Sequence, residues 1–379
     1  MAGPFCAMQL ADLGADVVKI ENPAGGDNVR LTPPFVAGES SNFIRLNRNK
    51  RSLALDLKDP AGKAAFRRLA VRTDIVVENL RPGTMAGLGL DYPQLAALNP
   101  GLIYVAASGW GRDGPYSRLA GLDIMAQGMS GLMSITGTEG GDPVKVGVPV
   151  CDLACALYGA LAAVSALEVR RRDGKGQLID VSLFEAGVSL AVWEAGRHFA
   201  TGEIPRAQGS AHQSTAPYQA FRAADGFFTA GVPSPKLWSV FLGVLGLDDL
   251  AQDPRFTSNA ERLRHRDELA RLIEEVTTRQ PVTHWLAAFQ AGGVPCNPIQ
   301  DYGQVFSDPH LESRSYFWEG QHPTAGAVRQ LGSPMRMSET PTRRDWAGPL
   351  LGQHSAEVLG EVGYGPDEIA VLRESGVIA

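Results

Sequence analysis

The chain has 379 residues, of which 44% are hydrophobic and 20% are charged, as in ordinary soluble enzymes. This length predicts two domains, or one large domain with an insertion. The net charge of −6 argues against nucleic-acid binding, which requires a basic surface. No apolar run reaches the roughly 18–20 residues of a membrane span, and we expect the best candidate, Leu153 to Leu167, to be a buried helix. No membrane partner is therefore predicted.

The first half of the chain alternates short apolar runs with helical patterns. The expected strands are Asp16–Glu21, Ser52–Leu57, Asp74–Val77, Leu102–Ala107 and Leu178–Leu183. The expected helices are Phe5–Leu13, Ala61–Arg72, Pro93–Leu98 and Leu153–Val169. This alternation predicts an α/β fold with a Rossmann-like parallel sheet, whose ligands bind at the carboxyl ends of the strands.

The pattern changes after about residue 200, where a segment rich in Gly, Ser and Ala resembles a linker. We expect a large α/β domain over residues 1–200, a smaller α+β domain over 205–305, and a return to the large domain over 306–379. The elements expected in these later parts are a β unit at Tyr218–Val232, helices at Leu237–Leu245, Arg262–Thr278 and Thr283–Gln290, strands within Gly320–Arg336, and final helices at Ser355–Val362 and Pro366–Ser375.

Cysteine and histidine usage gives no sign of a disulfide framework or a metal site. The four cysteines, Cys6, Cys151, Cys155 and Cys296, form no CxxC pair and are interpreted as small apolar core residues. The seven histidines are scattered and form no HxxxH or HExxH motif, so no metal is predicted. Reduced cysteines and the lack of a secretory signal at the N-terminus predict a cytoplasmic protein.

Asp152 lies between a segment marked by Gly147 and Pro149 and the apolar helical run that starts at Leu153. A carboxylate there can accept hydrogen bonds from unpaired backbone N–H groups and lies at the positive end of the helix dipole. Both effects favour the ionised form, which a nucleophilic carboxylate needs. Taken alone, however, the pattern favours the simpler interpretation of a helix N-cap.

Two further motifs are weaker. Gly109–Gly114 reads GxGxxG after an expected strand, but Pro115 follows at once and no acidic residue ends a second strand about 20 residues later, so a nicotinamide or flavin site has little support. Asn47–Ser52 and Glu78–Gly83 place cations at strand ends, which suits the phosphates of a ligand. A solvated basic loop is the more common outcome of such a charge run. The chain has no GxSxG motif, so a serine hydrolase is not supported.

Taken in order, several stretches resemble the family III CoA-transferases (CaiB/BaiF type), a group that includes acyl-CoA racemases. The stretches that carry the resemblance are Ala2–Cys6, Leu10–Glu21, Asn47–Asp59, Glu78–Gly83, Ser108–Gly111, Gly114–Pro115, Asp142–Asp152, Ala216–Phe221, Gly293–Pro295 and Pro349–His354. Within the family, the chain is most similar to the branch that moves CoA between dicarboxylic acids such as succinate and glutarate. Family members usually have a β-strand before Ala2, so either the start of this chain is misassigned or trimmed, or the first strand is missing.

The resemblance implies a role for individual residues. Asp152 falls at the catalytic aspartate, whose carboxylate attacks an acyl-CoA thioester and passes through a mixed anhydride and an aspartyl-CoA thioester. Coenzyme A is then a co-substrate rather than a permanently bound cofactor. The positions implied to bind the CoA nucleotide are Leu55, Lys58, Asn79, Leu80, Arg81 and Leu88. Asp123, Gly209 and His212 are implied to lie near the substrate, although His212 equally suits a cap of the following turn.

The resemblance also implies an interlocked, ring-like homodimer with acyl-CoA and carboxylic acid substrates. One departure concerns the reaction: racemases carry a histidine before the aspartate of a Gly-His-Asp element, and this chain reads Gly121-Leu122-Asp123. Because leucine cannot transfer a proton, racemisation loses one of its two bases. We therefore expect a CoA-transferase, with an acyl-CoA racemase and a non-catalytic CoA- or dinucleotide-binding protein as alternatives. The residues do not identify the donor and acceptor acids.

Overall fold

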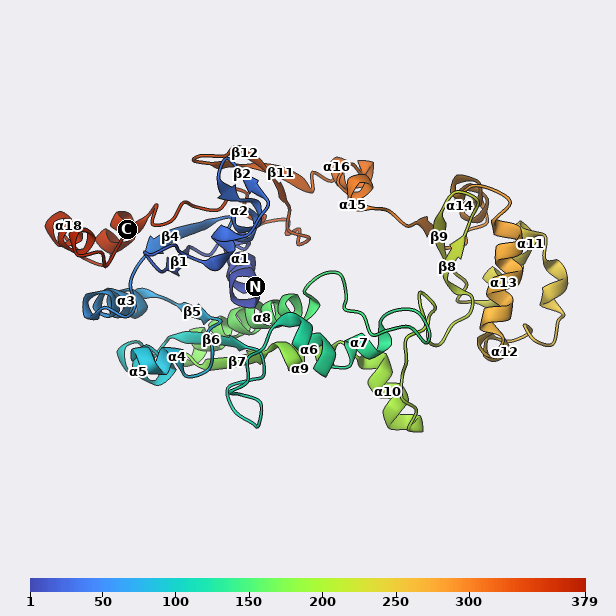
Figure 1. The fold of residues 1–379 in the computed structure, drawn as a ribbon, viewed down its shortest axis with the longest axis horizontal. Helices are drawn as coiled ribbons and strands as arrows, with labels where there is room; N and C mark the ends of the chain where they lie inside the picture. Colours follow the sequence, from blue (N-terminus) through green and yellow to red (C-terminus); the bar gives the residue numbers. More distant parts are fainter. The chain divides into compact units, whose positions relative to one another are not determined.

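A computed structural model describes residues 1–379, which divide into two compact units (Figure 1). The larger unit contains Met1–Leu132, Lys145–Gly196 and Pro309–Ala379. The smaller unit contains Met133–Val144 and Arg197–Asp308. The segment Met133–Val144 thus joins a unit whose other residues follow it by more than fifty positions, which no local sequence pattern signals.

The larger unit contains two parallel sheets, and this part of the predicted α/β fold is confirmed. In the first, β1 (Val17–Glu21) pairs with β4 (Lys50–Ala54), with Val17 opposite Lys50. In the second, β6 (Ile103–Ser108) lies between β5 (Ile75–Glu78) and β7 (Leu178–Ser182). Every residue of β6 is buried, as expected for the central strand of a parallel sheet.

Helices cover these sheets, and their ends follow local signals. α3 (Pro60–Arg72) begins at the Asp59 side chain, which accepts a hydrogen bond from Ala61 N, and has proline in its first turn. Aspartate and proline are favoured at these positions. α1 (Ala2–Asp12) and α5 (Tyr92–Leu98) lie close to the expected ranges. Up to residue 201, the helices not expected from the sequence are α2 (Ser41–Leu46), α4 (Thr84–Leu88), α6 (Asp123–Met129), α7 (Leu132–Ile135), α9 (Leu183–Ser189) and α10 (Val192–Thr201).

The longest helix, α8 (Val150–Asp173), is long and apolar enough to cross a membrane by length and composition. The expectation that no segment reaches this length was wrong, because the helix starts before Leu153 and continues through its cationic end to Gly174, which has a left-handed backbone. α8 packs against α1, α9, β6 and β7 (Figure 1). A core helix of a globular protein passes the same test of length and composition.

The smaller unit is built on a three-stranded antiparallel sheet. Its strands are β8 (Tyr218–Arg222), β9 (Phe227–Gly231) and β10 (Cys296–Pro298), with β9 in the centre. Its helical elements are α11 (Pro235–Leu245), η2 (Asp248–Ala251), α12 (Asn259–Arg264), α13 (Arg266–Thr277), α14 (Val282–Ala291) and α15 (Tyr302–Val305). Aromatic rings fill the core, and Phe241 stacks on Phe289 with ring centroids 4.9 Å apart.

The C-terminal part completes the larger unit. It contains α16 (Pro309–Ser313), the hairpin of β11 (Phe317–His322) and β12 (Gly326–Leu331), and the helices α17 (Ser355–Glu361) and α18 (Pro366–Glu374). α17 and α18 contribute Val358, Leu359, Ile369 and Leu372 to the core that also holds Leu53. The remaining short elements of the unit are η1 (Asn28–Leu31), β2 (Phe35–Val36) and β3 (Glu39–Ser40).

The segment Asn47–Ser52 is neither a solvated loop nor a site open to phosphates, because all six of its residues are buried. Arg48 pairs with Asp12, and Arg51 pairs with Asp16, Glu357 and Glu361. Expectations based on charge runs were therefore wrong here, since burial of these cations is offset by carboxylates distant in sequence.

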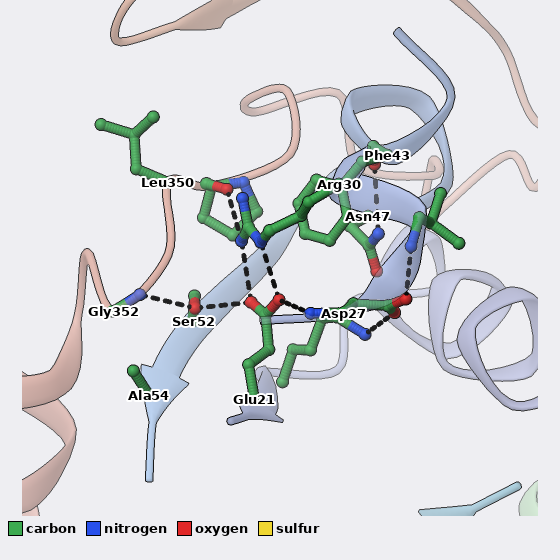
Figure 2. Close-up of polar contacts among 12 residues, drawn as sticks. Glu21, Asp27, Arg30, Phe43, Asn47, Ser52, Ala54, Leu350 and Gly352 are labelled. Atoms are coloured by element: carbon green, nitrogen blue, oxygen red, sulfur yellow. Dashed lines mark hydrogen bonds and ion pairs between the residues drawn. The ribbon is translucent and has the colours of Figure 1, made fainter. Parts of the chain in front are cut away.

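The buried polar contacts continue on the neighbouring strand. Ser52 Oγ donates to Glu21 at 2.8 Å and accepts from Gly352 N at 3.0 Å (Figure 2). Burial opposes ionisation of Glu21, but the hydrogen bond and charge of Arg30 outweigh it and lower the pKa of Glu21. β1, β4 and the C-terminal loop are thereby joined through ionised groups.

Candidate active site

Asp152 is the third residue of α8, and the N-cap position is Pro149. The interpretation of Asp152 as the N-cap of its own helix is therefore wrong. Its side chain instead reaches another helix: Oδ1 accepts a hydrogen bond from Ala2 N, the first residue of α1, at 3.1 Å. Oδ2 has no hydrogen-bond partner, and the residue is half-buried. One carboxylate oxygen is thus held between two helix N-termini while the other remains available.

The cap of α8 comes from Asp123, the first residue of α6. Its Oδ1 accepts from Cys151 N at 2.9 Å and from Asp152 N at 3.2 Å. Its Oδ2 accepts from Gln127 Nε2 at 2.6 Å. Because Pro149 offers no side-chain acceptor at the N-cap position, this external carboxylate satisfies the first free N–H groups of α8. Both oxygens of Asp123 are occupied, so its place beside Asp152 is that of a support.

The position of Asp152 at the start of its own helix predicts a stabilised anion. Burial instead raises the pKa of Asp152. The charge of the Met1 amino group and the hydrogen bond from Ala2 oppose this increase, and the charge of Asp123 adds to it. Desolvation disfavours the charged form of any carboxyl group. The resulting carboxylate is more basic than an exposed aspartate, which favours attack on an electrophilic carbon.

Asn79, which follows β5, meets the same end of α1. Its Oδ1 accepts from Gly3 N at 3.3 Å, and its Nδ2 donates to Ala107 O at 2.8 Å. A Cβ atom on Gly3 would lie 2.7 Å from Asn79 Cβ, so glycine is required for this close approach. The first two N–H groups of α1 are therefore divided between Asp152 and Asn79, which places Asn79 next to the candidate nucleophile.

The other residues expected to bind CoA lie in the larger unit but form no cluster with Asp152. Leu55 is buried and its backbone bridges to Ile378, so its side chain belongs to the core. Leu88 ends α4 and packs against that core. Lys58, Leu80 and Arg81 are exposed. The exposed side chains remain available to a ligand, whereas Leu55 can offer only limited surface.

Gly209 and His212, which are expected near the substrate, lie in the smaller unit. Gly209 has a left-handed backbone and donates from N to Gly137 O at 2.9 Å. The His212 ring stacks on Tyr218 with centroids 4.8 Å apart, and its Nδ1 accepts from Ser214 N at 3.2 Å. This last bond supports the interpretation of His212 as a cap of the following turn.

The cysteines, the possible metal ligands and the Gly109 motif give little support to other kinds of active site. Burial raises the pKa of the Cys6 and Cys155 thiols to about 12, and high-pKa thiols are poor nucleophiles. No group of three or more His, Cys, Asp or Glu side chains is placed to hold a metal ion. The Gly109 motif leads into a loop rather than a helix, and a Cβ on Gly109 would lie 2.9 Å from Gly121 Cα. Gly109 serves this close approach, while Gly111 and Gly114 have left-handed backbones in the loop. A dinucleotide fingerprint must open a helix, so the motif is not one here.

The fold and the site together define an α/β protein with a half-buried carboxylate suited to nucleophilic catalysis. Comparison with known proteins identifies the family. The model of "CoA-transferase family III" matches residues 1–355, and the chain belongs to this family. It is therefore an enzyme that transfers CoA and uses CoA as a co-substrate.

Individual relatives agree with this assignment. The chain is 38% identical to a "Succinyl-CoA:glutarate CoA-transferase" of Mus musculus, over 100% of this chain and 87% of the relative. It is 37% identical to a "Succinate--glutarate CoA-transferase" of Agrobacterium fabrum, over 96% of this chain and 92% of the relative. A crystal structure of a CaiB/BaiF family protein from Brucella suis superposes with a TM-score of 0.86 at 37% identity and covers 96% of each chain.

Proposed function

We propose that this enzyme transfers CoA from succinyl-CoA, or a similar acyl-CoA, to a dicarboxylic acid, with Asp152 as the covalent nucleophile. The observation that carries the proposal is the asymmetry of the Asp152 carboxylate, in which Oδ1 is held by Ala2 N and Oδ2 is without a partner. The names of the similar relatives support succinyl-CoA as donor and glutarate as an acceptor.

The first half of the reaction moves CoA onto the enzyme. Asp152 Oδ2 attacks the thioester carbon, the C–S bond breaks, and a mixed anhydride and a CoA thiolate form. The thiolate then attacks the Asp152 carboxyl carbon, which releases the donor acid as a carboxylate and leaves an aspartyl-CoA thioester. This covalent route preserves the thioester free energy while the acids exchange.

The second half reverses these steps with another acid. The acceptor carboxylate attacks the aspartyl thioester carbon and expels the thiolate, and the thiolate attacks the acyl carbon of the new anhydride and regenerates Asp152. In both covalent intermediates Asp152 Oδ1 becomes a carbonyl oxygen, and Ala2 N–H already points at it. A backbone N–H fixed in this way stabilises the tetrahedral oxyanions formed at that carbon.

Other residues are assigned supporting roles within this proposal. Asn79 borders the reacting carboxyl group, while Lys58 and Arg81 supply exposed cations for the phosphates of CoA. Leu55, Leu80 and Leu88 provide apolar surface at the same ligand, as the family resemblance implies. Asp123 fixes the first turn of α8 by accepting from Cys151 N and Asp152 N. The family resemblance assigns Gly209 and His212 to contact with the acid.

We further propose a homodimer, interlocked as a ring as the family resemblance implies. Leu157, Leu161 and Val164 form an exposed apolar stripe on α8, and no residue of α10 is buried. A second copy of this chain is the proposed cover of that surface. The four cysteines are free and form no disulfide, which supports the proposed location in a reducing cytoplasm.

The function is tested by incubating the enzyme with succinyl-CoA and a panel of acids in deuterated water. We expect new acyl-CoA to appear with glutarate or another dicarboxylate, and no transfer by the Asp152→Asn variant. α-Proton exchange without an acceptor acid would show a racemase instead. CoA binding without transfer for any acid, or transfer that persists in Asp152→Asn, would contradict the proposal.

A further inference from the structure

Helix α1 is held at both ends by consecutive residues of one buried segment. At its C-terminal end, Arg48 Nη2 and Nε donate to the two oxygens of Asp12 at 2.5 and 3.0 Å, and Asn49 Nδ2 donates to Asp12 Oδ1 at 2.9 Å. At its N-terminal end, Lys50 Nζ donates to Pro4 O at 2.7 Å. The position of α1 is therefore fixed by the segment Asn47–Ser52.

The environment of Lys50 is unusual for a lysine, because the side chain is fully buried and no carboxylate contacts it. Besides Pro4 O, its Nζ donates to Leu46 O at 3.1 Å and to Asn47 Oδ1 at 2.8 Å. These three acceptors match the three N–H groups of an ammonium ion. Leu46 ends α2, where a cation interacts favourably with the helix dipole.

Burying an ammonium group without a counter-ion is costly, and burial lowers the pKa of Lys50 well below its usual value. A hydrophobic side chain of similar length would avoid this cost but would remove the hydrogen bonds of Lys50 Nζ to three buried oxygens. The contact thus joins the first turn of α1 to the end of α2 with little freedom of movement.

The first turn of α1 is also where the catalytic carboxylate is held. Ala2 and Gly3, just before Pro4, donate their N–H groups to Asp152 and Asn79. We propose that Lys50 is a positioning residue, which holds the first turn of α1 so that Ala2 N–H stays directed at Asp152 Oδ1. This inference rests on the proposed function of Asp152 but assigns a separate role to Lys50, the first residue of β4.

The positioning role of Lys50 predicts a change in the pH dependence of catalysis, which a general loss of stability does not. If α1 shifts, Asp152 loses an N–H donor to its ionised form, so the carboxylate becomes harder to ionise. The acidic limb of the pH–rate profile should then move to higher pH. The charged groups that act on Asp152 are the amino group of Met1, which lowers its pKa, and the carboxylate of Asp123, which raises it. Asp123 keeps its own hydrogen bonds when α1 shifts.

The test compares Lys50→Met with a control at the other end of α1, Asn49→Gly. Asn49 has a φ of 58°, which glycine adopts freely, so the control removes side-chain bonds without backbone strain. For Lys50→Met we expect kcat to fall by about tenfold, the effect of about 1.4 kcal/mol, and the acidic limb to rise by about one pH unit. For Asn49→Gly we expect a lower Tm with an unmoved acidic limb.

A second readout does not depend on turnover. The Asp152 carboxyl carbon is followed by NMR in protein labelled with 13C at aspartate, with its signal assigned by its loss in Asp152→Asn. The proposal predicts that this signal titrates at higher pH in Lys50→Met than in the wild type, even if the enzyme proves to catalyse another reaction. An unchanged titration in a folded Lys50→Met protein would refute the positioning role whatever the activity.

If Lys50→Met does not fold, Asn47→Ala serves instead, because it removes one of the three acceptors of Lys50 Nζ and keeps the lysine. The same upward movement is then expected on a smaller scale, about threefold in kcat. Equal movement of the titration in Asn47→Ala and Asn49→Gly would show a general loosening of α1 and would overturn the specific role of Lys50.

Discussion

Two regions of the larger unit bury charged groups, and they differ in how completely those groups are paired. In the segment Asn47–Ser52, each cation has carboxylate or carbonyl partners from distant parts of the chain. In the first turn of α8, Asp123 is fully hydrogen-bonded, but Asp152 keeps one oxygen without a partner. The saturated region stabilises the fold, and the unsaturated carboxylate is available for chemistry.

The comparison explains why the charge run misled the sequence analysis, and why Asp152 is still a candidate for chemistry although it does not cap its own helix. Buried polar groups are normally satisfied, so a cluster that satisfies itself has nothing left for a ligand. A lone acceptor held at one oxygen by a backbone N–H is the exception that merits a functional interpretation. Four predictions test this distinction.

The largest effect is expected for Asp152→Asn. The amide keeps an oxygen for Ala2 N–H but is a poor nucleophile, so we expect transfer to fall by about three orders of magnitude or more, as when other covalent nucleophiles are removed. The free energy of unfolding should change by less than about 1 kcal/mol, because the hydrogen bond from Ala2 N is kept. Steady-state rates and thermal unfolding measure the two effects. A large loss of stability in Asp152→Asn would contradict the assignment of this aspartate to catalysis rather than to the fold.

Arg48→Met should show the opposite pattern. It leaves Asp12 as a buried carboxylate without its ion-pair partner, and breaking a buried pair in this way costs about 3–5 kcal/mol. The double variant Arg48→Met/Asp12→Leu should recover part of this loss, since no charge then remains unpaired. Urea unfolding of the two variants tests this, and equal stabilities would argue against the pairing as the source of the effect.

Gly3→Ala tests the point where the two regions meet. The new methyl group would lie 2.7 Å from Asn79 Cβ, so the first turn of α1 must move and its bonds to Asn79 and Asp152 must lengthen. We expect kcat to fall by about tenfold, which corresponds to about 1.4 kcal/mol of lost transition-state stabilisation. An unchanged kcat would mean that the exact position of α1 does not matter to catalysis.

The smallest effects are expected for Lys58→Ala and Arg81→Ala. Both side chains are exposed and form no ion pair within the larger unit, so stability should not change. As contacts to CoA phosphates they should each raise KM for the acyl-CoA by about three- to tenfold, with kcat retained, and the effect should shrink at high salt. Loss of kcat instead would assign these cations a role in the reaction itself.

Much of the fold could be predicted from the sequence. Alternating apolar runs located the five parallel strands of the larger unit, although β4 begins at Lys50 rather than Ser52 because its first residues are buried cations. The short helices α4 and α6 were missed, since so few residues show no clear helical period. The place of Met133–Val144 in the smaller unit depends on long-range contacts that no local pattern contains.

The candidate site was predictable only in part. Asp152 and Asn79 were found through the family resemblance, and their meeting at the first turn of α1 followed from no local pattern. Asp152 accepts from a residue 150 positions away, and Asp123 accepts from residues up to 29 positions away. Local spacing therefore could not show that Asp123, and not Asp152, caps α8. Lys50 was expected at the surface because it is charged, and no local pattern indicated that its side chain is buried.

The central claim, that Asp152 is the covalent nucleophile, is tested most directly by trapping the intermediate. The enzyme is incubated with succinyl-CoA, quenched with hydroxylamine or borohydride, and digested for peptide mapping by mass spectrometry. We predict that the modified residue lies in the peptide containing Asp152 and that Asp152→Asn shows no adduct. Full transfer activity with an unmodified Asp152 peptide would contradict this account.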